Sequence, residues 1–130
     1  MVLNCISVHA SRLFNEAYYQ NEWCNKWNGQ TEVILNDNTR IDCETKNYVA
    51  EFDFAKKWAE AIGQSLHYGR MTGKKPAIIL IIEKPSDFKY FNRIKPLCKE
   101  HGITLWYMKG VFYNSKGKPL ILKDIKKHFI

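Results

Sequence analysis

The chain has 130 residues, 45% of them hydrophobic and 14% aromatic, which predicts a single globular domain with a real core. Its longest apolar run, residues 77–82, is too short to cross a bilayer, so a membrane span is not expected. The sequence also contains no glycine-rich phosphate loop and no Gly-x-Ser-x-Gly elbow, which disfavours nucleotide hydrolysis and esterase chemistry.

The formal net charge of +7 is unevenly distributed along the chain. Residues 30–60 contain seven acidic and four basic side chains, whereas residues 61–130 contain fourteen basic and four acidic ones. A basic body around an acidic cluster fits an enzyme that attracts a polyanion to a bound divalent cation, because Lys and Arg neutralise phosphates. A basic surface with ordinary solvated charges fits the same distribution.

The N-terminal segment, residues 1–10, lacks the basic start and the full apolar core of a signal peptide. Val8-His9-Ala10 nevertheless resembles a cleavage-site tripeptide, so the segment is interpreted as an N-terminal extension or the remnant of a leader. Residues 11–27 carry apolar side chains at a helical spacing and predict an amphipathic helix, with Ser11 as a candidate N-cap. Asn28-Gly29 is expected to end it.

Residues 31–35 and 39–43 flank a polar turn and predict an antiparallel hairpin. Residues 48–54 then alternate with the period of a strand. This alternation places Glu51 and Asp53 on the same face.

Residues 55–71 are good helix formers, and the continuous aliphatic run that follows them predicts a central strand covered on both faces. Residues 86–101 predict a second helix, with Pro96 as a kink or a boundary, and residues 103–108 predict another strand. A helix between two strands implies a parallel, right-handed crossover.

The basic C-terminal extension, residues 109–130, contains a turn signal at residues 114–117 and predicts a short basic helix after residue 122. The full order of elements is helix, three antiparallel strands, helix, strand, helix, strand. It predicts an α/β fold in which a mixed sheet has helices on both faces.

The four cysteines show no CxxC pairing, and the four histidines show no HExxH spacing, so neither zinc nor a histidine-based metal site is indicated. Cys24, near the end of the first helix, and Cys43, in the second strand, could meet. They would form a disulfide in an exported protein and remain buried thiols in a cytosolic one.

Three carboxylates, Asp42, Glu51 and Asp53, are grouped where the second and third strands meet. Metal-assisted phosphodiester cleavage needs such carboxylates to hold a divalent cation, and a cationic or polar group near the developing charge. Lys57, at the start of the following helix, is the candidate for the second role, with Lys56 as the second choice. A solvated hairpin beside ordinary surface lysines is the plainer interpretation.

The helix that follows adds two further polar side chains to this region. Gln64 and Tyr68 share one face with Lys57, because they are separated by helical steps. Glu16, on the first helix, could add a further carboxylate, although a helical glutamate is usually exposed.

Together, the order of elements and these residues resemble the PD-(D/E)XK phosphodiesterase superfamily, with its restriction-endonuclease-like αβββαβ core, over residues 11–108. In that family an Asp on the second core strand and an acid-x-Lys triplet on the third share the metal and the attacking water. The resemblance places Asp42 at the first position and Glu51 at the second. Asp53 stands where the family has its lysine, so Lys57 is expected to replace that lysine.

Gln64 resembles the helix glutamine of superfamily nucleases that resolve or trim DNA, and Glu16 resembles their first-helix glutamate. Residues 51–64 are also similar to a group of small bacterial proteins in which Trp23-Cys24 and Asp42-Cys43 recur, often behind a leader peptide.

The resemblance implies a nuclease dependent on Mg²⁺ or Mn²⁺ that acts on DNA rather than RNA. Its expected metal ligands are Asp42, Glu51, Asp53 and Glu16. The alternative is a module that kept the fold, lost the chemistry with Asp53, and binds nucleic acid or a protein partner. The sequence leaves the oligomeric state open, a homodimer included.

Overall fold

The computed structural model describes residues 14–110, 112–113, 119–120 and 125–127. The main elements, in chain order, are α2 (Glu16–Lys26), β1 (Gln30–Ile34), β2 (Arg40–Glu44), β3 (Tyr48–Phe54), α3 (Trp58–Thr72), β4 (Lys75–Ile82), α4 (Phe88–His101) and β5 (Thr104–Lys109). Two 3-10 turns, η1 (Ala55–Lys57) and η2 (Pro85–Asp87), lead into α3 and α4. The remaining strands are β6 (Phe112–Tyr113), β7 (Pro119–Leu120) and β8 (Ile125–Lys127).

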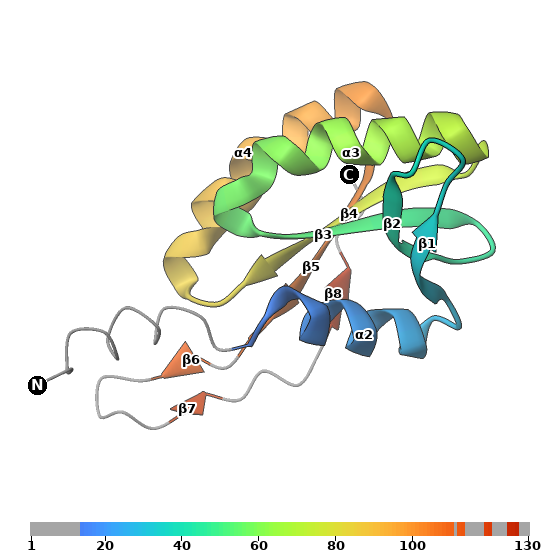
Figure 1. Cartoon of the computed structure of the whole chain (residues 1–130). Helices are drawn as coiled ribbons and strands as arrows, with labels where there is room; N and C mark the ends of the chain where they lie inside the picture. The colour runs from blue at the N-terminus through green and yellow to red at the C-terminus, as the bar shows by residue number, and fades with distance from the viewer. Residues whose placement is uncertain (1–13, 111, 114–118, 121–124, 128–130) are drawn as a thin grey trace, which may run out of the picture.

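One mixed sheet contains six of these strands in the order β1-β2-β3-β4-β5-β8 (Figure 1). The first three strands form an antiparallel meander, β3, β4 and β5 run parallel, and β8 pairs antiparallel with β5. Each parallel connection contains a helix, α3 or α4, as a crossover requires. The predicted α/β class with a mixed sheet is therefore confirmed.

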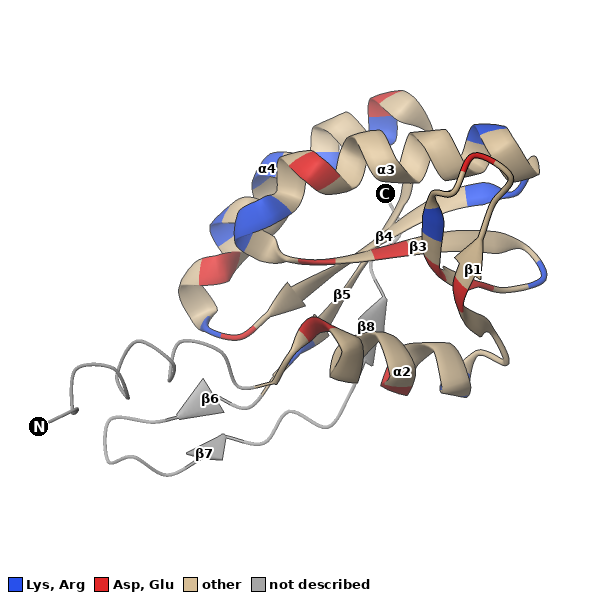
Figure 2. Cartoon of the chain, viewed as in Figure 1, with Lys and Arg blue, Asp and Glu red and all other residues tan. Residues whose placement is uncertain are grey.

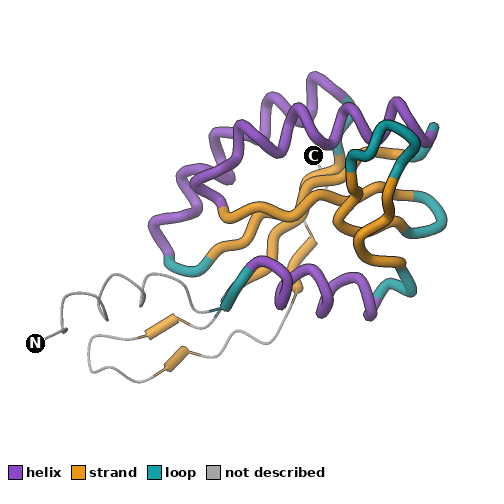
Figure 3. The backbone as a smooth tube through the Cα atoms, in the orientation of Figure 1, coloured by secondary structure: helices purple, strands orange, loops and turns teal. Residues whose placement is uncertain are grey.

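Helices cover both faces of the sheet, with α2 on one side and α3 and α4 on the other (Figure 3). On the α2 side, Trp23 packs edge-on against Phe52 with ring centroids 5.7 Å apart. On the opposite side, Ile78 of β4 belongs to a core cluster with Phe91 of α4. Residues 77–82 are completely buried because β4 has cover on both faces, which explains their continuous aliphatic sequence.

The first helix is shorter than the sequence predicts. Asn15 is its N-cap, since the Asn15 side chain accepts a hydrogen bond from the Tyr18 amide at 2.9 Å. The candidate cap Ser11 lies outside the described residues, as does the proposed leader remnant. At the other end Asn28 adopts a left-handed φ of 54°, so the helix stops where the Asn-Gly signal predicts.

One prediction for the C-terminal half is wrong, and one of the two alternatives predicted for Pro96 is excluded. Residues 125–127 form strand β8 instead of a basic helix, because the edge of β5 offers backbone groups that β8 satisfies. Pro96 is no boundary, since α4 continues through it from Phe88 to His101. The turn predicted at residues 114–117 lies outside the described residues. Within the described part, no helix is long and apolar enough to span a membrane.

Candidate functional site

Strands β2 and β3 separate in the middle of the sheet, and two carboxylates bridge the separation. The two strands are in register at only two positions. Beyond these, the Asp42 amide donates to Glu51 Oε1 at 3.3 Å, and the Phe52 amide donates to Asp42 Oδ2 at 2.9 Å. Each carboxylate thus satisfies a backbone N–H on the facing strand that the ladder leaves unpaired.

Strand β1 is distorted beside the same point. Glu32 has a left-handed φ of 56°, which is unusual for a residue that is not glycine. Its carboxylate pairs with Arg40 at 3.2 Å, and its charge contributes to raising the pKa of Asp42. The sheet is therefore irregular on both sides of Asp42.

Glu51 and Asp53 are buried on β3, with only 3% and 6% of their surfaces exposed. Burial, followed by the charge of Asp42, raises the pKa of Glu51 from 4.5 to about 10. Burial also raises the pKa of Asp42, while the bond from the Phe52 amide opposes the rise. Glu51 therefore holds its proton well above the pH at which carboxyl groups usually ionise, and the pKa of Asp42 is shifted in the same direction.

Asp53, two residues after Glu51 on β3, is the third acid of this group. Its pKa is raised to about 7 by burial first, then by the charges of Glu16 and Glu60, while Lys57 lowers it. Its Oδ2 atom is buried and has no hydrogen-bond partner among the described residues. A buried carboxylate oxygen without a partner is a common sign that an ion or a proton belongs there.

The structure brings most of the predicted site residues together. Glu16 lies half-buried in the first turn of α2, and its charge acts on Asp53. Lys57 is exposed at the end of η1 and also acts on Asp53. Gln64 is exposed on α3 and forms no hydrogen bond with the three carboxylates in the described part of the chain. The predicted catalytic role of Gln64 therefore stays a prediction.

Three further residues belong to the site, and from the sequence only Tyr68 had been placed in this region. Tyr68 is a buried residue of α3. Burial raises its pKa, and the charge of Glu51 raises it further. Its helical spacing from Lys57 already indicated this face. Glu60 is one helical turn beyond Lys57, so helical spacing could have placed it near the site. Glu32 could have been placed there by the hairpin register, which sets it opposite Asp42.

No protein-family model, no curated protein and no solved structure matches the chain. The site therefore has to be interpreted from its own geometry. In residues 14–110, no group of three or more His, Cys, Asp or Glu side chains is arranged to hold a metal ion. In this structure the carboxylates of Asp42 and Glu51 each accept a hydrogen bond from a backbone amide of the facing strand, so they do not converge on one point.

A disulfide lies next to the site on β2. Cys24 of α2 and Cys43 are joined with their Cα atoms 5.9 Å apart, so the open question about these cysteines is answered in favour of the bond. Gly29 makes room for it, because a Cβ at this position would lie 2.5 Å from Cys43 Sγ and 2.7 Å from Cys24 Sγ. The bond fixes α2 to the strand that carries Asp42.

The charges of the chain are separated in space as well as in sequence. Acidic residues lie along the β1–β3 part of the sheet, whereas many Lys and Arg residues lie on α4 and at the ends of the helices (Figure 2). The Lys and Arg residues on α4 and at the ends of the helices would attract a polyanion to the molecule.

Proposed function

We propose that the protein is a nuclease that depends on a divalent cation, Mg²⁺ or Mn²⁺, and hydrolyses phosphodiester bonds, of DNA rather than RNA. The observation that supports this proposal most directly is the group of three acids, Asp42, Glu51 and Asp53, at the point where β2 and β3 separate. The order α2-β1-β2-β3-α3-β4 also agrees with the αβββαβ core of the restriction-endonuclease-like fold.

The electrostatics of the three acids favour a cation. All three pKa values are raised, with burial as the largest cause, and the pKa of about 10 keeps Glu51 protonated at neutral pH. Divalent cations of this type prefer carboxylate oxygens and displace such protons when they bind. Asp53 Oδ2 is available for this role without the loss of any described hydrogen bond.

Asp42, Glu51 and Asp53 would hold the cation, which requires Asp42 and Glu51 to turn away from the backbone amides that they bind in this structure. When bound, the cation supplies Lewis-acid polarisation of the phosphate and activation of water for attack on phosphorus. Lys57, exposed beside Asp53, would place its ammonium group against a phosphate oxygen and neutralise part of the charge that develops there.

The test is a nucleic-acid cleavage assay with variants of the site. Single-stranded DNA, double-stranded DNA and RNA are incubated with the wild type, Asp42→Asn, Glu51→Gln and the control Glu100→Gln, whose side chain is exposed on α4. Each site variant should lose at least about 100-fold in rate, the size typical of removing one key polar group from an active site. The control should cleave as the wild type does, and intact cleavage by both site variants would exclude this site.

A non-catalytic binding module is the second candidate, and two observations favour it. Lysine is absent from position 53, and the Asp42 and Glu51 side chains already serve the backbone of the facing strand. Thermal unfolding with Mg²⁺, Mn²⁺ and Ca²⁺ separates the candidates, because a bound cation stabilises the folded state. Absence of stabilisation by any of them, with salt-sensitive DNA binding, would support the module.

The Cys24–Cys43 disulfide bears on where either candidate would act. Such bonds form and persist in oxidising compartments and are rare in the cytosol. It therefore supports an exported protein over a cytoplasmic one, and a free-thiol count on protein isolated from cells tests this.

A further inference from the structure

An aromatic pocket lies at the turn between β2 and β3, at the opposite end of β3 from Asp53. Its volume is about 230 Å³, and four aromatic side chains line it: Trp23, Trp27, Tyr48 and Trp106. The Trp106 ring lies 5.4 Å from that of Trp23 and 4.9 Å from that of Tyr48, measured between centroids. Trp27 is 38% exposed, so part of the aromatic wall is open to solvent.

A basic groove of about 450 Å³ continues from this pocket, and both are lined by Lys46, Asn47 and Tyr48. Lys74 and Lys75 complete the basic lining of the groove. The two openings therefore form one continuous surface, aromatic at one end and cationic at the other.

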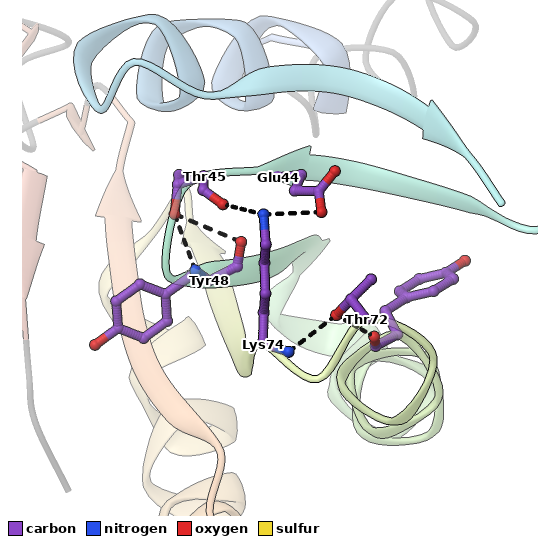
Figure 4. A network of polar contacts seen from close by, with 6 residues as sticks. Glu44, Thr45, Tyr48, Thr72 and Lys74 are labelled. Atoms are coloured by element: carbon purple, nitrogen blue, oxygen red, sulfur yellow. Dashed lines mark hydrogen bonds and ion pairs between the residues drawn. The ribbon is translucent and has the colours of Figure 1, made fainter.

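The lysines of the groove differ in what they do. Lys74 is used by the fold: its ammonium group donates to the Thr45 carbonyl at 2.8 Å and pairs with Glu44 at 3.0 Å (Figure 4). Lys46 and Lys75 are exposed, and neither forms an ion pair with any described residue. Lys74 thus fixes the turn, and two cationic groups remain for a ligand.

The neighbouring charges decide which ligand suits the aromatic pocket. Aromatic walls accept either a quaternary ammonium group or a flat ring. The adjoining lysines repel a cation and attract an anion, which excludes the first class. The indole N–H of Trp23 is buried and has no hydrogen-bond partner among the described residues.

We propose that this surface binds a nucleotide unit, with the base among the aromatic rings and the phosphate against Lys46 and Lys75. The same chemistry is offered by a free mononucleotide and by one residue of a single strand. Tyr48 and Asp53 are five residues apart on one strand, which at about 3.3 Å per residue separates them by about 17 Å. The site is thus distinct from the carboxylates and independent of whether these are catalytic.

The four tryptophans provide an internal control in one experiment. A ¹⁵N-correlation spectrum of the oxidised protein in EDTA resolves the four indole N–H signals during titration with thymidine monophosphate or decathymidylate. Signals of Trp23, Trp27 and Trp106 should shift, while that of Trp58 should not, because Trp58 lies on α3 over the other face of the sheet. Shifts confined to Trp58, or no shifts with either probe, would overturn the proposal.

Affinity measurements with variants then test each half of the surface. Trp27→Ala should weaken binding by roughly 5- to 140-fold, the range for loss of one base-stacking aromatic. Replacing Lys46 and Lys75 together by glutamine should reduce the slope of log K against log salt by about 1.4 for the oligonucleotide. The control Lys99→Gln, on the exposed last turn of α4, should change neither quantity.

The probes distinguish the possible sources of the nucleotide. Equal affinity for the monophosphate and the oligonucleotide identifies a free nucleotide, whereas binding of the oligonucleotide alone identifies a single strand. Thymidine without phosphate should bind more weakly than the monophosphate. Tighter binding of tetramethylammonium than of either nucleotide probe, or equal binding by Trp27→Ala and the wild type, would refute the assignment.

Discussion

Replacing Glu51 by glutamine is expected to stabilise the protein when divalent cations are absent, and the gain should grow with pH. Glutamine has the shape of the protonated glutamate. Its side-chain oxygen can still accept from the Asp42 amide, and its NH₂ group can donate to the Asp42 carboxylate. The replacement therefore keeps the bridge between β2 and β3 and removes only the titration.

The size of the effect follows from the two pKa values of Glu51. The unfolded chain releases the proton near 4.5 and the folded protein near 10, so between these values the folded state holds one proton more. Stability from this group is fully present below 4.5 and falls by about 1.4 kcal/mol per pH unit above it. By pH 7 the wild type has lost about 3 kcal/mol that the variant retains.

Urea unfolding in EDTA at pH 5, 6, 7 and 8 measures this difference. The free energy of unfolding of Glu51→Gln should exceed that of the wild type by about 1.4 kcal/mol more at each step of one pH unit. Asp53 also titrates in this range in both proteins, and its charge is one of the causes that raise the pKa of Glu51. The exposed variant Glu100→Gln should follow the wild type. Parallel curves for the wild type and Glu51→Gln would refute the reasoning.

Three further predictions concern stability alone. Removing the Cys24–Cys43 bond by the double replacement with serine should lower the free energy of unfolding by about 3 kcal/mol, from the entropy of a loop of 19 residues, and urea unfolding without reductant checks it. Gly29→Ala should destabilise the oxidised protein by about 1–3 kcal/mol, because its methyl group would overlap both sulfur atoms, and should leave the reduced protein much less affected. Pro96→Ala should raise the free energy of unfolding by about 2 kcal/mol, since the proline removes a hydrogen bond inside α4; an unchanged or lower value would contradict this.

Periodicity made much of the fold predictable. The aliphatic run in β4 follows from cover on both faces of the strand, and the alternation in β3 marks it as a strand although both of its faces are buried. The end of the chain was not predictable in this way. Residues 125–127 have a composition suited to a basic helix, but the unpaired edge of β5 determines their conformation.

The grouping of Asp42, Glu51 and Asp53 could also be inferred, because hairpin register and strand alternation are local properties. How these side chains are used could not. The Asp42–Glu51 bridge lies where β2 and β3 separate, between a core cluster that contains Trp23 of α2 and another that contains Tyr68 of α3, and these are far apart in the sequence. The aromatic pocket could not be predicted either, because Trp23, Tyr48 and Trp106 come from three distant parts of the chain.

The separation of β2 and β3 also marks where the molecule should open most readily. On one side of it, α2 and β2 are covalently joined through Cys24 and Cys43, and on the other side β3, β4 and β5 share continuous parallel ladders. Two register positions and two side-chain bonds connect these units between β2 and β3, and Lys74 joins them at one end through Glu44 and Thr45. We expect the amide proton of Phe52 to exchange with solvent faster than those of Ile79 and Leu80, through a partial unfolding that precedes the global one.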